Sequence, residues 1–74
     1  MEAKILKLLQ AEYPDIHFEA ATELVDDGVL DSFTLMGIIT TLSREFNVDI
    51  PYGEINEDNF NSIANMAKMI QRLT

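Results

Sequence analysis

A chain of 74 residues that contains no cysteine has to hold its fold together by packing alone. Domains of this size usually need disulfides, a bound metal, oligomerisation or efficient helix packing. The missing cysteines exclude disulfides and thiolate metal sites, and a single histidine cannot build a histidine-rich one. Hydrophobic residues make up 47% of the chain, which can support a small helical core. We therefore expect one helical domain spanning residues 1–74, without a metal site.

Three stretches have the three- and four-residue apolar spacing that is typical of amphipathic helices: residues 2–12, 32–47 and 61–73. Pro14 ends the first helix, and Asn61 or Ser62 caps the last one. A helical turn is expected within residues 52–58, with Ile55 facing inward. The expected core positions are Ile5, Leu8, Leu9, Leu35, Ile38, Ile39, Leu42, Phe46, Val48, Ile50, Ile63, Met66, Ala67, Ile70 and Leu73. Leu6 lies off the first stripe and is expected to be partly exposed.

Residues 14–31 form a long connection between the first two helices. It contains too many apolar residues for a free linker, namely Ile16, Phe18, Leu24, Val25, Val29 and Leu30. Connections of this length are usually functional or are pinned by packed side chains. We expect an ordered loop laid over the core, in which His17 has no special role.

The net charge of −8 argues against binding a nucleic-acid backbone, which requires clustered Lys and Arg. Eleven of the 13 acidic residues lie in residues 12–31 and 49–58. These stretches read either as two solvated acidic loops or as surfaces that attract basic partners. The second stretch lacks the Asp-x-Asp-x-Asp-Gly arrangement of a calcium-binding loop, so we expect no calcium site there.

The sequence also carries expectations about location. No apolar run approaches the roughly 20 residues of a membrane span. The start Met1-Glu2-Ala3-Lys4 lacks the basic and apolar regions of a signal peptide. Together with the absence of cysteine, this predicts a cytoplasmic protein.

Asp31 and Ser32 stand where the central helix begins. Both residue types cap helices well, so one interpretation is that either residue serves only as a cap. The alternative is functional, because a helix N-terminus favours phosphate and a serine hydroxyl there suits a phosphodiester. Phe33 and Met36 point away from the core stripe, as does Thr40, and Gly37 leaves a gap beside them. They are either peripheral core or an exposed docking patch.

Taken together, several of these residues resemble the acyl carrier protein family. The match comprises Gly28-Val29-Leu30-Asp31-Ser32-Phe33, the spacing of Leu35, Ile39, Leu42 and Phe46, then Val48-Asp49-Ile50-Pro51 and Phe60-Asn61-Ser62-Ile63. It covers nearly the whole chain and implies an all-α, antiparallel four-helix bundle with a short third helix and a long ordered loop between helices one and two.

The resemblance also implies a function. Ser32 would carry 4′-phosphopantetheine, installed by a dedicated transferase from coenzyme A with magnesium, and the arm's thiol would hold an acyl group as a thioester. Asp31 would help to position the transferase and its metal. Phe33 and Met36, with Gly37 and Thr40, would contact partner enzymes. The chain itself has no catalytic constellation and would be a monomeric, non-catalytic carrier.

One departure from the family bears on the cargo. Carriers of fatty-acid synthesis typically have an acidic central helix, whereas residues 32–47 hold only Arg44 and Glu45 among charged residues. The main expectation is a carrier of acyl intermediates in fatty-acid, polyketide or related biosynthesis. A D-alanyl or aminoacyl/peptidyl carrier is the alternative, since the Asp-Ser-Phe variant resembles D-alanyl carriers. An unmodified helical interaction module is the alternative of another class.

Overall fold

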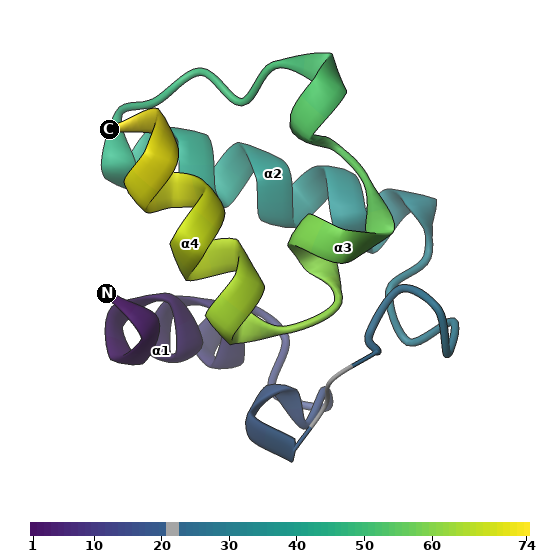
Figure 1. The fold of residues 1–74 in the computed structure, drawn as a ribbon. Coiled ribbons are helices and arrows are strands. Elements are labelled where there is room, and N and C mark those ends of the chain that lie inside the picture. The colour runs from purple at the N-terminus through teal and green to yellow at the C-terminus, as the bar shows by residue number, and fades with distance from the viewer. Residues whose placement is uncertain (21–22) are drawn as a thin grey trace.

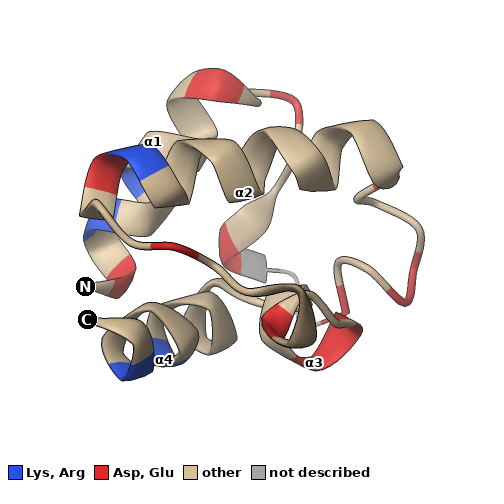
Figure 2. Cartoon of the chain, turned by 90° about the horizontal axis from the view of Figure 1, so that it is seen from above, with Lys and Arg blue, Asp and Glu red and all other residues tan. Residues whose placement is uncertain are grey.

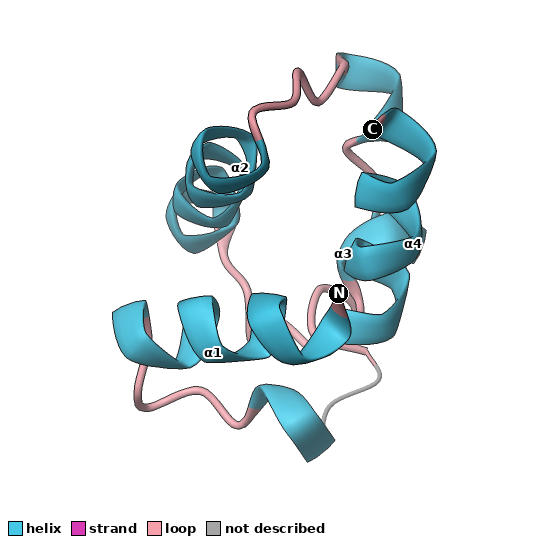
Figure 3. Cartoon of the chain, turned by 90° about the vertical axis from the view of Figure 1, so that its left-hand side faces the viewer, coloured by secondary structure: helices cyan, strands magenta, loops and turns pink. Residues whose placement is uncertain are grey.

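The computed structural model describes residues 1–20 and 23–74 and contains only helices and connecting segments over these ranges. The elements are α1 (Glu2–Glu12), the 3-10 helix η1 (Phe18–Ala20), α2 (Ser32–Phe46), the 3-10 helix η2 (Tyr52–Glu54), α3 (Glu57–Phe60) and α4 (Ile63–Leu73). Figure 1 shows their course. The expected all-α bundle with a short third helix is confirmed. Figure 3 shows α2 on one side and the α3–α4 pair on the other, with α1 below them.

The core fills the space that these helices enclose. Its buried hydrophobic side chains are Ile5, Leu9, Phe18, Leu24, Leu30, Ile38, Leu42, Phe60, Ile63, Met66, Ala67, Met69 and Ile70. Half-buried side chains pack around it, among them Leu35, Ile39, Phe46, Val48, Ile50 and Leu73. Most of the expected core positions are thus confirmed, while Ile55 is half-buried. Burial of this apolar surface is the main stabilising term for the fold.

The face of α1 was predicted wrongly in one respect. Leu8 is half-buried and lies outside the core cluster, beside Lys4, Lys7 and Ala11 on the outer side of the helix. Leu6 packs against the core instead and lies near Phe18. The helix faces η1 and α4, so its core side comprises the buried Ile5 and Leu9 and the half-buried Leu6, which is partly exposed as expected.

The connection between α1 and α2 is ordered over the core wherever it is described; its residues 21–22 lie outside the described ranges. Phe18, Leu24 and Leu30 are buried in it, as expected. Val29, another apolar residue of this connection, is 46% exposed. It lies between the buried Leu30 and a turn at Gly28, where the positive φ of 75° suits glycine. Of the neighbouring side chains of Val29 and Leu30, only that of Leu30 reaches the core.

The end of α1 is joined to the middle of α2 by polar contacts. The buried Thr41 hydroxyl donates to the Glu12 carboxylate, with O···O distances of 2.9 and 3.1 Å. The Arg44 Nη2 atom lies 3.6 Å from Oε1 of the same carboxylate. Tyr13 lies against Gly37, where an added Cβ would overlap the tyrosine hydroxyl. These contacts fix how α2 crosses α1.

Short polar contacts define the ends of α3 and α4. Ser62 caps α4 by accepting from the Asn65 N–H at 3.1 Å, so the cap predicted at position 61 or 62 is Ser62. Arg72, near the end of α4, pairs with Glu54 of η2. Since Glu12 and Glu54 both have basic partners, the two acidic stretches are not wholly without neutralising charge.

Candidate functional site

The start of α2 is held by Asp31. Its backbone is extended, with φ −81° and ψ 178°, and its Oδ1 accepts from the Thr34 N–H at 2.8 Å. This is the geometry of an N-cap, which satisfies one of the free donors of the first turn. The bond from the Thr34 backbone, aided by the Thr34 side chain, lowers the pKa of Asp31. Asp31 is therefore ionised at neutral pH, and its carboxylate caps α2 without help from Ser32.

Ser32 is the first residue of α2 and is exposed. Because Asp31 supplies the cap, the Ser32 hydroxyl is not needed for it, and it forms no hydrogen bond with any residue in the described ranges. In Figure 1 the start of α2 lies at the end of the molecule away from both termini. The hydroxyl is thus presented to solvent beside an ionised carboxylate and a helix N-terminus.

The surroundings of Ser32 are acidic. The loop from Glu23 to Asp31 carries four carboxylates and no Lys or Arg. Figure 2 shows Lys and Arg toward the end of the molecule that holds the termini, whereas acidic residues lie on α3 and on the loop that precedes α2. A basic surface on a partner would approach this end most favourably.

Three of the predicted docking residues share the solvent side of α2, where helical spacing places them together. Phe33 is 88% and Met36 is 65% exposed, and Thr40 is exposed with its hydroxyl donating to the Met36 carbonyl at 3.0 Å. Phe33 and Met36 are thus exposed apolar groups and not peripheral core. The exposed Val29 adds a further apolar group in the loop just before the helix.

Gly37 does not leave the expected gap beside this patch. It is half-buried, and the Tyr13 hydroxyl occupies the space where a side chain would begin. The glycine therefore admits a tyrosine from α1 and opens no room for a partner.

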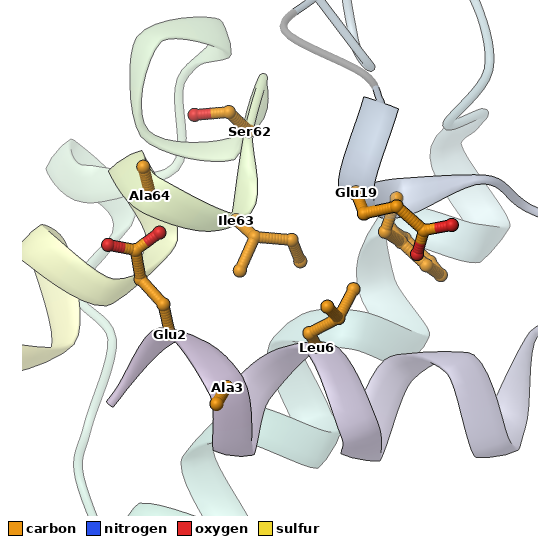
Figure 4. Close-up of a pocket in the computed structure, with 8 residues that line it drawn as sticks. Glu2, Ala3, Leu6, Glu19, Ser62, Ile63 and Ala64 are labelled. Carbon is orange, nitrogen blue, oxygen red and sulfur yellow. The ribbon is translucent and has the colours of Figure 1, made fainter.

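A pocket lies on another part of the surface, between α1, η1 and the start of α4. Figure 4 shows Leu6 and Ile63 pointing toward one another across it, with Glu2 and Glu19 on opposite sides. Ser32 and its neighbours do not line it. Within the described ranges, no three His, Cys, Asp or Glu side chains gather as a metal site would require, and no helix is long and apolar enough to cross a membrane.

Comparison with known proteins identifies the family. A family model described as a phosphopantetheine attachment site matches residues 3–70. A D-alanyl carrier protein of Lactobacillus delbrueckii subsp. bulgaricus is 27% identical over 66 residues, which cover 89% of this chain and 82% of the relative. A D-alanyl carrier protein of Streptococcus pyogenes serotype M1 is 31% identical over 51 residues, covering 69% of this chain and 65% of the relative. No solved structure matches the chain.

The family match spans the whole helical bundle, from α1 into α4. Proteins of this family are non-catalytic carriers. They hold their cargo on a covalently attached 4′-phosphopantetheine group. The helical fold and the exposed serine at a helix start agree with this match. The chain belongs to the acyl carrier protein family and is a carrier that holds 4′-phosphopantetheine covalently.

Proposed function

We propose that Ser32 is the attachment point of the phosphopantetheine arm. The observation that carries this proposal is the division of labour at the start of α2, where Asp31 caps the helix and Ser32 is exposed with a hydroxyl that binds no described residue. Attachment would cost the fold little, because the hydroxyl stabilises nothing that the structure describes. The positive end of α2 would favour the new phosphodiester.

The attachment reaction is a group transfer from coenzyme A. The Ser32 oxygen would form a bond to the phosphorus that bears the pantetheine, and the pyrophosphate bond would break. Adenosine 3′,5′-bisphosphate would leave, and the hydroxyl proton would pass to a base of the transferase or to solvent. The transferase and its magnesium supply this chemistry, whereas Asp31 contributes a fixed carboxylate next to the reacting oxygen.

We propose further that the cargo is a D-alanyl or related aminoacyl group held as a thioester on the arm. The most similar relatives described above are named D-alanyl carrier proteins, and this supports the aminoacyl alternative over a fatty-acyl or polyketide cargo. The neutral charge balance of α2, with only Arg44 and Glu45, supports it as well. The enzymes of fatty-acid synthesis usually meet a more acidic helix.

The partners proposed are the transferase and the enzymes that load and unload the cargo. Phe33 and Met36 would supply the apolar contact, and Thr40 would border it. A monomer that works in the cytoplasm fits this role, because a shuttling carrier must be released from each enzyme. These assignments support one another through the position of Ser32 next to the exposed patch.

The cargo can be tested by direct loading. The chain is first converted with coenzyme A and a broad-specificity phosphopantetheinyl transferase. It is then incubated with ATP, labelled D-alanine and the enzyme that loads the Lactobacillus relative; L-alanine and octanoate serve as competing substrates. We expect label from D-alanine that hydroxylamine releases, as a thioester should, and none on Ser32→Ala. Loading with octanoate in preference to D-alanine would overturn the aminoacyl proposal.

A further inference from the structure

Asn61 makes contacts that its predicted role as a possible helix cap does not require. It lies between α3 and α4 and is only 7% exposed. Its Oδ1 accepts from the Val25 N–H at 2.9 Å and from the Asp26 N–H at 3.1 Å. Its Nδ2 donates to Asp26 Oδ2 at 3.1 Å, and its backbone carbonyl accepts from the Leu24 N–H at 2.9 Å. One residue thus satisfies three consecutive N–H groups of the loop before α2.

These contacts fix the start of a closed turn. The Leu30 N–H donates to the Leu24 carbonyl at 3.0 Å, so the two ends of residues 24–30 are tied together. Leu24 and Leu30 are both buried in the core. Asp31 follows Leu30 directly, and Ser32 follows Asp31. The position of the serine therefore depends on where the turn is anchored, and Asn61 is the polar part of that anchor.

We propose that Asn61 is a positioning residue for the modification of Ser32: it holds residues 24–31 in the one arrangement that presents Asp31 and Ser32 to the modifying enzyme. This rests on the proposed attachment at Ser32. Without Asn61 the turn would populate several arrangements, and only part of the molecules would be competent to bind. The apparent affinity of the enzyme falls by that fraction, which raises KM and leaves kcat nearly unchanged.

The contacts of Asn61 allow a sharper design than removal alone. Asn61→Ala deletes all three hydrogen bonds of the side chain. Asn61→Asp keeps an acceptor for the Val25 and Asp26 N–H groups but places a carboxylate against Asp26 Oδ2. Adding Asp26→Asn to Asn61→Asp exchanges donor and acceptor across the pair and restores the bond. Asp26→Asn alone is the reference for the double variant, because it makes the same change at position 26 while Asn61 stays, and the parent is the reference of equal net charge.

The experiment measures phosphopantetheinylation by a broad-specificity transferase with coenzyme A, at a temperature where every variant is folded by circular dichroism. We expect Asn61→Ala and Asn61→Asp to lower kcat/KM about tenfold, through KM, which corresponds to about 1.4 kcal/mol. The double variant should recover to the level of Asp26→Asn alone. Ile70→Val, which thins the core in α4 and has no bond to the loop, is the control for lost stability and should keep the parent KM.

A second readout does not depend on the enzyme. Amide hydrogen exchange of Leu30 and Thr34, whose N–H groups donate to Leu24 and Asp31, should be faster in Asn61→Ala but not in Ile70→Val. Parent-like KM in Asn61→Ala would overturn the inference, as would an equal loss in Ile70→Val. If the parent chain accepts no group at all, the attachment proposal fails, and unchanged exchange in Asn61→Ala would then overturn the positioning role separately.

Discussion

Replacing Gly37 by alanine should destabilise the protein, although the same change in most helices stabilises it. In an exposed helix interior alanine is more favourable than glycine by about 1 kcal/mol. At Gly37 the new Cβ would overlap the Tyr13 hydroxyl oxygen, while the ring carbon that bears it is 3.6 Å away, an ordinary contact. The conflict is therefore with one oxygen atom of Tyr13.

The magnitude follows from the two opposing terms. Inserting an atom into a packed contact typically costs about 1–3 kcal/mol, so the helix gain is cancelled or exceeded and the net loss reaches about 2 kcal/mol. Tyr13 is half-buried and packs against the core, so moving it away forfeits packing. In a Tyr13→Phe background the overlap is gone, and Gly37→Ala should stabilise by about 1 kcal/mol. The sign of the effect should thus reverse between the two backgrounds.

Urea unfolding of the four chains of this cycle measures the coupling between the two positions. For a domain of this size about 1 kcal/mol shifts the thermal midpoint by roughly 4–8 °C, so a thermal scan gives an independent check. Gly53→Ala is the matched control, because nothing lies within 4 Å of its added Cβ. A Gly37→Ala chain that is stabilised as much with Tyr13 as with Phe at that position would refute the packing argument.

The remaining predictions concern charge and docking. Asp31→Ala should lower the thermal midpoint at neutral pH, because it removes the hydrogen bond from the Thr34 N–H. Since folding lowers the pKa of Asp31, the midpoint difference between parent and variant should be complete above the unfolded pKa of about 3.9 and should vanish as the pH falls through the folded pKa. A midpoint difference that persists in strong acid would contradict this. The midpoint of the parent should rise between low salt and about 0.1 M salt as repulsion in the acidic loops is screened, and a flat or falling midpoint would count against that repulsion. Phe33→Ala should weaken binding of the transferase by about 2 kcal/mol or more, as measured by Kd at two salt concentrations. This loss should exceed that of the double variant Asp26→Asn/Asp27→Asn, because charges at the rim of a contact contribute little. The opposite ranking would place the contact on the loop before α2.

The helices of this fold were predictable because their signals are local. The spacing of Ile38 and Leu42 with their half-buried neighbours marks one face of α2, and Asp31 is among the residue types that cap helices best. Pro14 lies just after the end of α1 at Glu12, so it marks where that helix stops, whereas Pro51 precedes the 3-10 helix η2. The exposure of Phe33 and Met36 could be stated only as one of two alternatives, because the helical pattern shows which side they share but not what covers it.

What sequence reasoning missed depends on contacts between distant segments. The spacing in α1 indicates an apolar face, but whether Leu6 or Leu8 packs against the core is set by the contacts of α1 with other elements, and it is Leu6 that does so. Gly37 and Tyr13 are 24 positions apart, so nothing near the glycine indicates what fills the space beside it. Asn61 looks like a local cap, and only the fold brings it to the loop that precedes Ser32. Asp31 and Ser32 were predictable because both belong to the start of one helix, where the sequence signals are local.

The attachment of phosphopantetheine to Ser32 is tested most directly by the intact mass of the purified chain, before and after treatment with coenzyme A and a broad-specificity phosphopantetheinyl transferase. We expect the chain to gain the mass of one phosphopantetheine group, or to carry it already, and fragmentation to place the group on Ser32. Ser32→Ala should remain folded, because the Asp31 cap is kept, and should gain nothing. A parent chain that stays unmodified, or a Ser32→Ala chain that gains the full mass, would contradict the assignment of Ser32 as the attachment site.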